Sequence, residues 1–314
     1  MKIAKGINKS FSFKKNSFKE NLELSFLALP GFLHMLLVCY IPMVGVIIAF
    51  KKFNPNLGIW GSKWVGLENF KFFFTSNDFT RVMRNTLLYG AGFLALDNIA
   101  AISMAIILYN VTSRKLLKVY QTSMILPKFM SAVLIAFIVY ALLNPVSGII
   151  NQLIVLCGGT PKDWYSEAAY WPFILTVVHL WQTIGMSSIL YYACLMGIDE
   201  SLFEAARVDG ANKWHEIKSI IVPEIMGLLC IQLILGVGSL VNGDFGLFYQ
   251  TPMNVGVLYS TTDIINTYVF RALQEATNMG RTAAVGLFQS VAGMLLVVGS
   301  NLVVRKISPE HSFF

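Results

Sequence analysis

Six long apolar segments set the main limit on what this chain can fold into. Each supplies roughly the twenty residues that an α-helix needs to cross a bilayer, and they cover residues 22–50, 86–109, 121–143, 170–196, 225–243 and 282–303. The chain of 314 residues is 55% hydrophobic and 13% charged, which is about half the charged share of a typical soluble domain. Backbone polar groups in lipid must be satisfied within their own segment, so these stretches predict helices. We expect an all-α integral membrane protein with six transmembrane helices.

The distribution of basic residues predicts how these helices are oriented. With the N-terminus inside, the inner segments hold 14 lysines and arginines and the outer segments hold 9. Cytoplasmic loops usually carry this excess, although the outer segment 51–85 runs against it. We therefore predict cytoplasmic termini. The expected organisation is a basic N-terminal tail (1–21), a six-helix domain (22–303) and a C-terminal tail (304–314).

The chain lacks the sequence motifs of several functional classes. It has no G-x-x-x-x-G-K-[ST] loop for ATP phosphates, no H-E-x-x-H metal motif and no G-x-S-x-G nucleophile motif. The four cysteines are far apart and form no C-x-x-C pair. We expect no catalytic residue, no bound metal and no enzymatic activity. Although the net charge is +7, the apolar content favours membrane lipid over nucleic acid as the partner.

The polar loop between the fourth and fifth apolar segments, residues 197–224, is unusually well formed. Ser201 and Glu204 fit a capping box that begins a short helix. Gly210 is placed to end that helix, because glycine accepts the left-handed conformation found at many helix ends. Asn212 is placed to cap a second short helix, which Pro223 is expected to end. The loop is therefore predicted to be two short helices joined at a glycine.

The same loop resembles the cytoplasmic coupling loop of binding-protein-dependent ABC importer permeases. The resemblance is carried by Glu204-Ala205-Ala206, then Asp209-Gly210, and Pro223 at the end of Ile220-Ile221-Val222-Pro223, where Val222 replaces the usual leucine. Elsewhere in the chain, Val65 to Phe70 and Arg84 to Leu87 are similar to the maltose-type, sugar-importing branch. Within that branch, Asp263 to Arg271 and Ala283 to Phe288 resemble permeases for polygalacturonan- and rhamnogalacturonan-type oligosaccharides.

The resemblance implies a fold, a site and a set of partners. The fold would be that of a type I ABC importer permease, multi-pass in the plasma membrane of a bacterium. The ATPase-coupling residues would be Glu204, Ala205, Ala206, Asp209, Gly210 and Pro223. The partners would be a second homologous permease subunit, two ATPase subunits that bind ATP and Mg, and an extracellular solute-binding protein, lipid-anchored or soluble. The chain itself would bind no cofactor.

Polar residues inside the predicted spans are candidates for the path of the solute. Such groups are costly in lipid and usually face the bundle interior or a water-filled cavity. Acids and amides also suit sugar hydroxyls. For any single residue, hydrogen bonding between helices is the alternative role. The candidates are Asp97, Asn98, Gln182, Asn242 and Asp244.

Two other functions compete with an importer permease at this stage. An ion-coupled secondary transporter of a hydroxylated solute would be expected to show charge relays within the membrane and internal repeats. Asp97 is the one plausible carboxylate deep in a predicted span, and no repeat is visible. A membrane-embedded enzyme would need a nucleophile or metal set, and no such motif is present. Dependence on a separate ATPase distinguishes the importer from the ion-coupled transporter.

Overall fold

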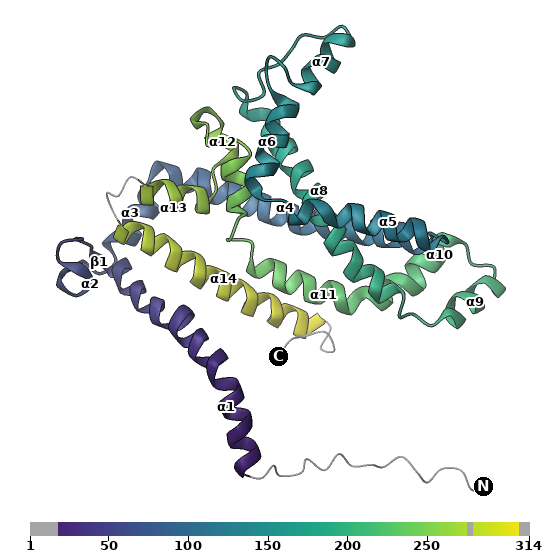
Figure 1. Ribbon diagram of the computed structural model, residues 1–314, viewed down its shortest axis with the longest axis horizontal. Helices are drawn as coiled ribbons and strands as arrows, with labels where there is room; N and C mark the ends of the chain where they lie inside the picture. Colours follow the sequence, from purple (N-terminus) through teal and green to yellow (C-terminus); the bar gives the residue numbers. More distant parts are fainter. Residues whose placement is uncertain (1–17, 275–278, 308–314) are drawn as a thin grey trace.

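The computed structural model describes residues 18–274 and 279–307, and these ranges are largely helical (Figure 1). Within them, the strand pairing is one short antiparallel hairpin of β1 (Lys51–Lys52) and β2 (Lys63–Trp64). The α-helices are α1 (Phe18–Met35), α2 (Gly58–Gly61), α3 (Glu68–Thr75), α4 (Asn77–Tyr109), α5 (Arg114–Ile125), α6 (Ala132–Leu143), α7 (Ile149–Leu156), α8 (Trp171–Leu195), α9 (Glu200–Val208), α10 (Lys213–Glu216), α11 (Val222–Gly238), α12 (Tyr259–Thr262), α13 (Ile265–Gln274) and α14 (Met279–Ile307).

In the described residues, five helices are long and apolar enough to cross a membrane, and a bent pair makes a sixth crossing if it is counted as one. The five cover Ser25–Phe50, Asn77–Tyr109, Ala168–Leu195, Lys213–Gly238 and Met279–Lys306. Each overlaps a segment predicted from the apolar pattern, so five of the predicted spans are confirmed. The predicted cytoplasmic tails 1–21 and 304–314 lie mostly outside the described residues.

The third predicted span, 121–143, is not one straight helix. It is divided between Arg114–Phe129 and Ala132–Leu143, which meet at 101°. Pro127 lies in the short 3-10 helix that ends the first part, and the hydroxyl of Ser131 accepts the backbone N–H of Leu134 to start the second. An N-cap residue has extended backbone angles rather than helical ones, so the chain changes direction here.

The first and fifth predicted spans also differ in detail from straight α-helices. In the first, α1 continues through Pro30, and the helix then becomes a π turn (Leu36–Tyr40) and a 3-10 helix (Ile41–Phe50) near Pro42. In the fifth, the helix ends at Gly238 rather than residue 243. Asn242 and Asp244 therefore lie in a non-helical segment just beyond the helix.

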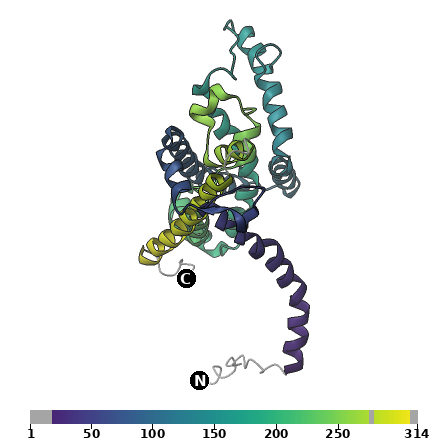
Figure 2. The ribbon, with the colours of Figure 1, turned by 90° about the vertical axis from the view of Figure 1, so that its left-hand side faces the viewer.

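The first apolar helix projects from the rest of the molecule (Figures 1 and 2). In Ser25–Phe50, only 6% of the most apolar window is buried within this chain. Phe26 and Leu27 are each more than three-quarters exposed. A helix that is apolar on all sides needs cover from lipid or from another protein chain.

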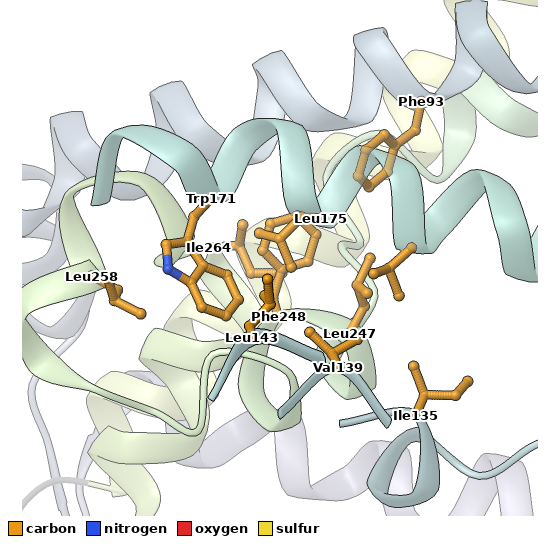
Figure 3. Close-up of a cluster of buried hydrophobic side chains, with 11 residues drawn as sticks. Phe93, Ile135, Val139, Leu143, Trp171, Leu175, Leu247, Phe248, Leu258 and Ile264 are labelled. Carbon is orange, nitrogen blue, oxygen red and sulfur yellow. The ribbon is translucent and has the colours of Figure 1, made fainter. Parts of the chain in front are cut away.

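The core has one central cluster and one cluster toward each end of the bundle. The central one joins α4, α6 and α8 to the segment 247–264, and Figure 3 shows Trp171, Leu175, Phe248 and Ile264 converging there. At one end, Phe203 of α9 packs with the ends of α4 and α8. At the other, Phe73 of α3 packs with α13 and α14. We call these the α9 end and the α13 end.

A buried carboxylate organises the α13 end. The side chain of Asp263 is fully buried, and it accepts hydrogen bonds from Arg81 Nη2 at 2.9 Å and Arg271 Nη2 at 2.6 Å. The hydroxyl of Thr267 donates to the same carboxylate at 2.8 Å. Asn85 of α4 donates to the backbone carbonyl of Asp263 at 3.0 Å. This network holds the start of α4 against α13.

Candidate functional site

A cavity of about 200 Å³ lies between α4, α8 and the non-helical segment after α11. Three of the five candidates for the solute path line it, namely Asp97, Asn242 and Asp244. Those three residues are far apart in sequence, and the fold brings them together. The other lining residues with polar or aromatic side chains are Thr86, Tyr89, Phe93, His179, Ser239 and Phe248.

Asp97 is held by two side chains of α8. His179 Nε2 lies 2.9 Å from one carboxylate oxygen, and the Thr183 hydroxyl donates to the other at 2.8 Å. The His179 ring stacks on Phe93, with centroids 3.9 Å apart and planes 7° from parallel. His179 is therefore a hydrogen-bonded residue of the helix bundle. These contacts fix the direction in which the Asp97 carboxylate points.

The far wall of the cavity is formed where the helix ends after Gly238. Asn266 of α13 donates to the carbonyl of Gly243 at 2.8 Å, and Gln289 of α14 donates to the carbonyl of Val241 at 2.9 Å. Gln289 also donates to the Asn266 side chain at 2.7 Å. The Asp244 carboxylate accepts the backbone N–H of Leu247 at 3.0 Å. Irregular backbone at this depth is thus hydrogen-bonded by neighbouring helices, as membrane burial requires.

The other two path candidates lie elsewhere. Asn98 donates to the carbonyl of Leu94 at 2.7 Å and accepts the Tyr191 hydroxyl at 2.6 Å, so it links α4 to α8 beside the cavity. Gln182, on α8, is not among the residues that line the cavity. Tyr89 and Phe93 also line the site but were not among the predicted site residues. They are four residues apart, as are His179 and Thr183, so each pair lies on one face of its helix. This spacing was the sequence feature that could have identified them.

This lining suits a neutral, hydroxyl-rich solute. Carboxylate and amide oxygens accept hydrogen bonds from hydroxyl groups, and the amide of Asn242 can also donate. The rings of Tyr89, Phe93 and Phe248 supply apolar faces next to these groups. Concave sites of this composition, apolar with a few convergent polar groups, are typical of small-molecule binding.

The loop at the α9 end, residues 199–212, has well-defined helix ends. Asp199 caps α9 by accepting the backbone N–H of Ser201 at 3.0 Å, so the predicted capping box of Ser201 and Glu204 is wrong. This hydrogen bond holds the pKa of Asp199 below its usual value. The helix ends as predicted at Gly210, where φ is 78°. There the N–H of Ala211 bonds to Ala206 and that of Gly210 to Arg207, which is a Schellman motif.

The second helix of this loop is longer than expected. Asn212 caps it, as predicted, by accepting the backbone N–H of His215 at 2.9 Å. Pro223 does not end it, because α10 continues through a π turn (Ile217–Ile221) into α11. Proline lacks the N–H of a regular α-helical turn. Here Pro223 lies in the first turn of α11, directly after the π turn, so the missing bond falls at the junction between the two helical geometries.

One part of this loop is anchored and another part is exposed. Phe203 is only 3% exposed and packs among the buried residues of the α9 end. The buried carboxylate of Glu216 accepts from Lys213 Nζ at 3.0 Å and Arg207 Nε at 3.3 Å, which ties α9 to α10. By contrast, Trp214 is 70% exposed. Three of the predicted coupling residues, Glu204, Ala205 and Asp209, are also exposed.

A protein family and a related bacterial protein each match most of this chain. The family described as "Binding-protein-dependent transport system inner membrane component" matches residues 97–309. The chain is 32% identical to the polygalacturonan/rhamnogalacturonan transport system permease protein YteP of Bacillus subtilis (strain 168), over 91% of this chain and 89% of YteP.

Two solved structures have the same fold. One is a bacterial ABC transporter involved in the import of the acidic polysaccharide alginate, with a TM-score of 0.83 and 28% identity over 92% of this chain and 97% of that one. The other is a bacterial alginate ABC transporter in complex with an alginate pentasaccharide-bound periplasmic protein. Its TM-score is 0.83, with 27% identity over 92% of this chain and 96% of that one.

Proposed function

Since the chain belongs to the family of binding-protein-dependent transport system inner membrane components, we propose that it is the permease subunit through which an ATP-driven importer passes a sugar or oligosaccharide. The observation that carries this proposal is the cavity between α4 and α8, where Asp97, Asn242 and Asp244 meet beside aromatic rings. A permease subunit is not itself an enzyme. The comparisons give no support to the ion-coupled alternative.

We further propose that the loop at the α9 end couples this chain to an ATPase subunit that binds ATP and Mg. Its anchored helix α9 and exposed residues, including Glu204, Ala205 and Asp209, support this role. Gly210 and the Schellman motif fix the angle between α9 and α10. In this arrangement the α9 end and both chain termini are cytoplasmic, and the α13 end faces the binding protein outside.

The proposed assembly has a second permease subunit and two ATPases. The exposed apolar surface of Ser25–Phe50 supports an association with another membrane chain or lipid. The family description names dependence on a binding protein, and we propose that this protein delivers the sugar to the α13 end. ATP-driven movement of the α9 end would then alternate access to the cavity.

The coupling role is tested by replacing Trp214 with alanine. Exposed tryptophans at protein interfaces often contribute 2 kcal/mol or more, so we expect the affinity for the ATPase to fall by about thirtyfold. The measurement is co-purification of the ATPase with this chain from membranes. Trp60→Ala is the control, because Trp60 is 76% exposed at the opposite side of the bundle. Equal retention of the ATPase by both variants would contradict the assignment.

The cavity is tested by replacing Asn242 with alanine. One hydrogen bond contributes about 0.5–1.5 kcal/mol, so we expect uptake of labelled oligosaccharide at low concentration to fall about two- to tenfold. Assembly with the ATPase should be unchanged. Gln182→Ala is the matched control, because it removes an amide of α8 that does not line the cavity. A loss of uptake in Gln182→Ala and none in Asn242→Ala would place the path elsewhere.

A further inference from the structure

The cavity between α4 and α8 is negatively charged. Two carboxylates, Asp97 and Asp244, line it, and no lysine or arginine is present among its described lining residues. His179 is the one lining group that can become cationic, and it already contacts Asp97. Even with His179 protonated, the second carboxylate leaves the lining with net negative charge.

The arginine cluster at the α13 end does not neutralise this charge. Arg81 and Arg271 line a separate cavity at the α13 end, which they share with Arg281. Both are paired with the buried carboxylate of Asp263, and Arg81 also bonds to Asp78 at 2.9 Å. Their guanidinium groups are therefore already engaged.

We propose that this cavity selects electrically neutral sugar units and rejects uronic-acid units. This inference rests on the proposed function and specifies its substrate class. A sugar hydroxyl can donate a hydrogen bond to Asp97 or Asp244, whereas a uronate carboxylate would bring a third negative charge into the same small space. Repulsion between like charges is strong where little water screens them, and it is an effective means of excluding a competing ligand.

The size of the cavity also limits how much of a sugar chain can lie beside these carboxylates at one time. Its volume of about 200 Å³ is below the range of about 300–1,000 Å³ for pockets that hold a drug-sized ligand. An oligosaccharide would therefore meet these carboxylates with one part of its length at a time. A chain with a carboxylate on every ring would encounter the repulsion at each step. The solved neighbour is described as importing the acidic polysaccharide alginate. The relative YteP is described as a polygalacturonan/rhamnogalacturonan permease, and polygalacturonan is built of uronate units. We therefore expect this chain to differ from both in charge preference.

The test uses two trisaccharides that differ only in charge. One is a labelled neutral hexose trisaccharide, and the other is the same molecule with each C6 hydroxymethyl group oxidised to a carboxylate. Binding to the purified permease–ATPase complex is measured by equilibrium dialysis without binding protein, so that selection by the binding protein does not contribute. We expect the neutral sugar to bind at least tenfold more tightly.

Variants connect this preference to the two acids. Asp244→Asn keeps an oxygen that can accept the N–H of Leu247, and it removes one charge. We expect the preference to shrink to about threefold or less in this variant and in Asp97→Asn. Asp163→Asn is the control, because Asp163 does not line the cavity; it should keep the wild-type ratio.

The outcomes separate this inference from the function on which it rests. Equal or tighter binding of the oxidised sugar to the wild-type complex would overturn the charge selection and leave the sugar-permease function standing. An unchanged preference in both cavity variants would also overturn it. If neither trisaccharide binds the complex and neither is taken up by membranes that contain the complete importer, both the inference and the proposed sugar function fail.

Discussion

Replacing Gly185 with alanine is expected to prevent the folded protein from accumulating in the membrane. A Cβ atom at this position would lie 1.9 Å from the carbonyl oxygen of Met124 and 2.3 Å from its carbonyl carbon. Both are backbone atoms of α5, so no side-chain rotation can relieve the overlap. The helices α5 and α8 would have to separate, and overpacking of this kind typically costs about 1–3 kcal/mol or more.

The measurement is the yield and thermal stability of the detergent-purified protein, followed by size-exclusion chromatography after heating. Gly92→Ala is the matched control on the adjacent helix α4. A Cβ at Gly92 would meet no atom within 4 Å, and alanine favours a helix by roughly 0.5–1 kcal/mol over glycine. We expect the control to match or exceed the wild type. Similar behaviour of the two variants would mean that α5 and α8 do not pack this closely.

Replacing Asp263 with asparagine is expected to destabilise the α13 end. The substitution keeps the shape of the side chain and removes the charge that Arg81 and Arg271 share. Removal of one partner from a buried ion pair costs about 3–5 kcal/mol. We expect the lower part of that range, because the side chains of Arg81 and Arg271 are 32% and 18% exposed and water can partly solvate them.

Asp78→Asn provides a comparison at the same arginine. Asp78 also lies 2.9 Å from Arg81, but its side chain is 45% exposed, and exposed pairs contribute about 0–1 kcal/mol. The readout is the thermal midpoint together with hydrogen exchange of the α13 backbone amides. Faster exchange is expected for Asp263→Asn and near wild-type exchange for Asp78→Asn. If Asp78→Asn had the larger effect, Asp263 would not be the centre of this network.

The apolar pattern was sufficient to predict the helices but not their directions. Hydropathy identified all six segments, because each helix must cover its backbone with apolar side chains. The 101° bend after Phe129 was missed. Its local signals, Pro127 and Ser131, are also compatible with a kinked but continuous span. The bend depends on tertiary packing, since α5 lies against Gly185 of α8 while α6 packs in the central cluster.

The sequence was enough to predict which residue types form the site, but not where the fold places each side chain. Asp97 and Asn98 are neighbours in sequence, but successive residues on a helix point about 100° apart. The fold therefore places Asp97 in the cavity and Asn98 against Tyr191. In the loop at the α9 end, Gly210 and Asn212 were predicted correctly because local backbone chemistry decides helix ends. Pro223 was not, because the sequence did not reveal the π turn before it.

The helical stretch from Lys213 to Gly238, which includes the π turn, connects two distant parts of the molecule. Its 26 residues span roughly 39 Å at the rise of an α-helix. One end carries exposed Trp214, and the other leads directly into Ser239 and Asn242 at the cavity wall. In the proposed importer, a push or rotation applied near Trp214 would be carried along this helix to the cavity wall. The wall proposed to contact the solute and the surface proposed to contact the ATPase would then move as one part.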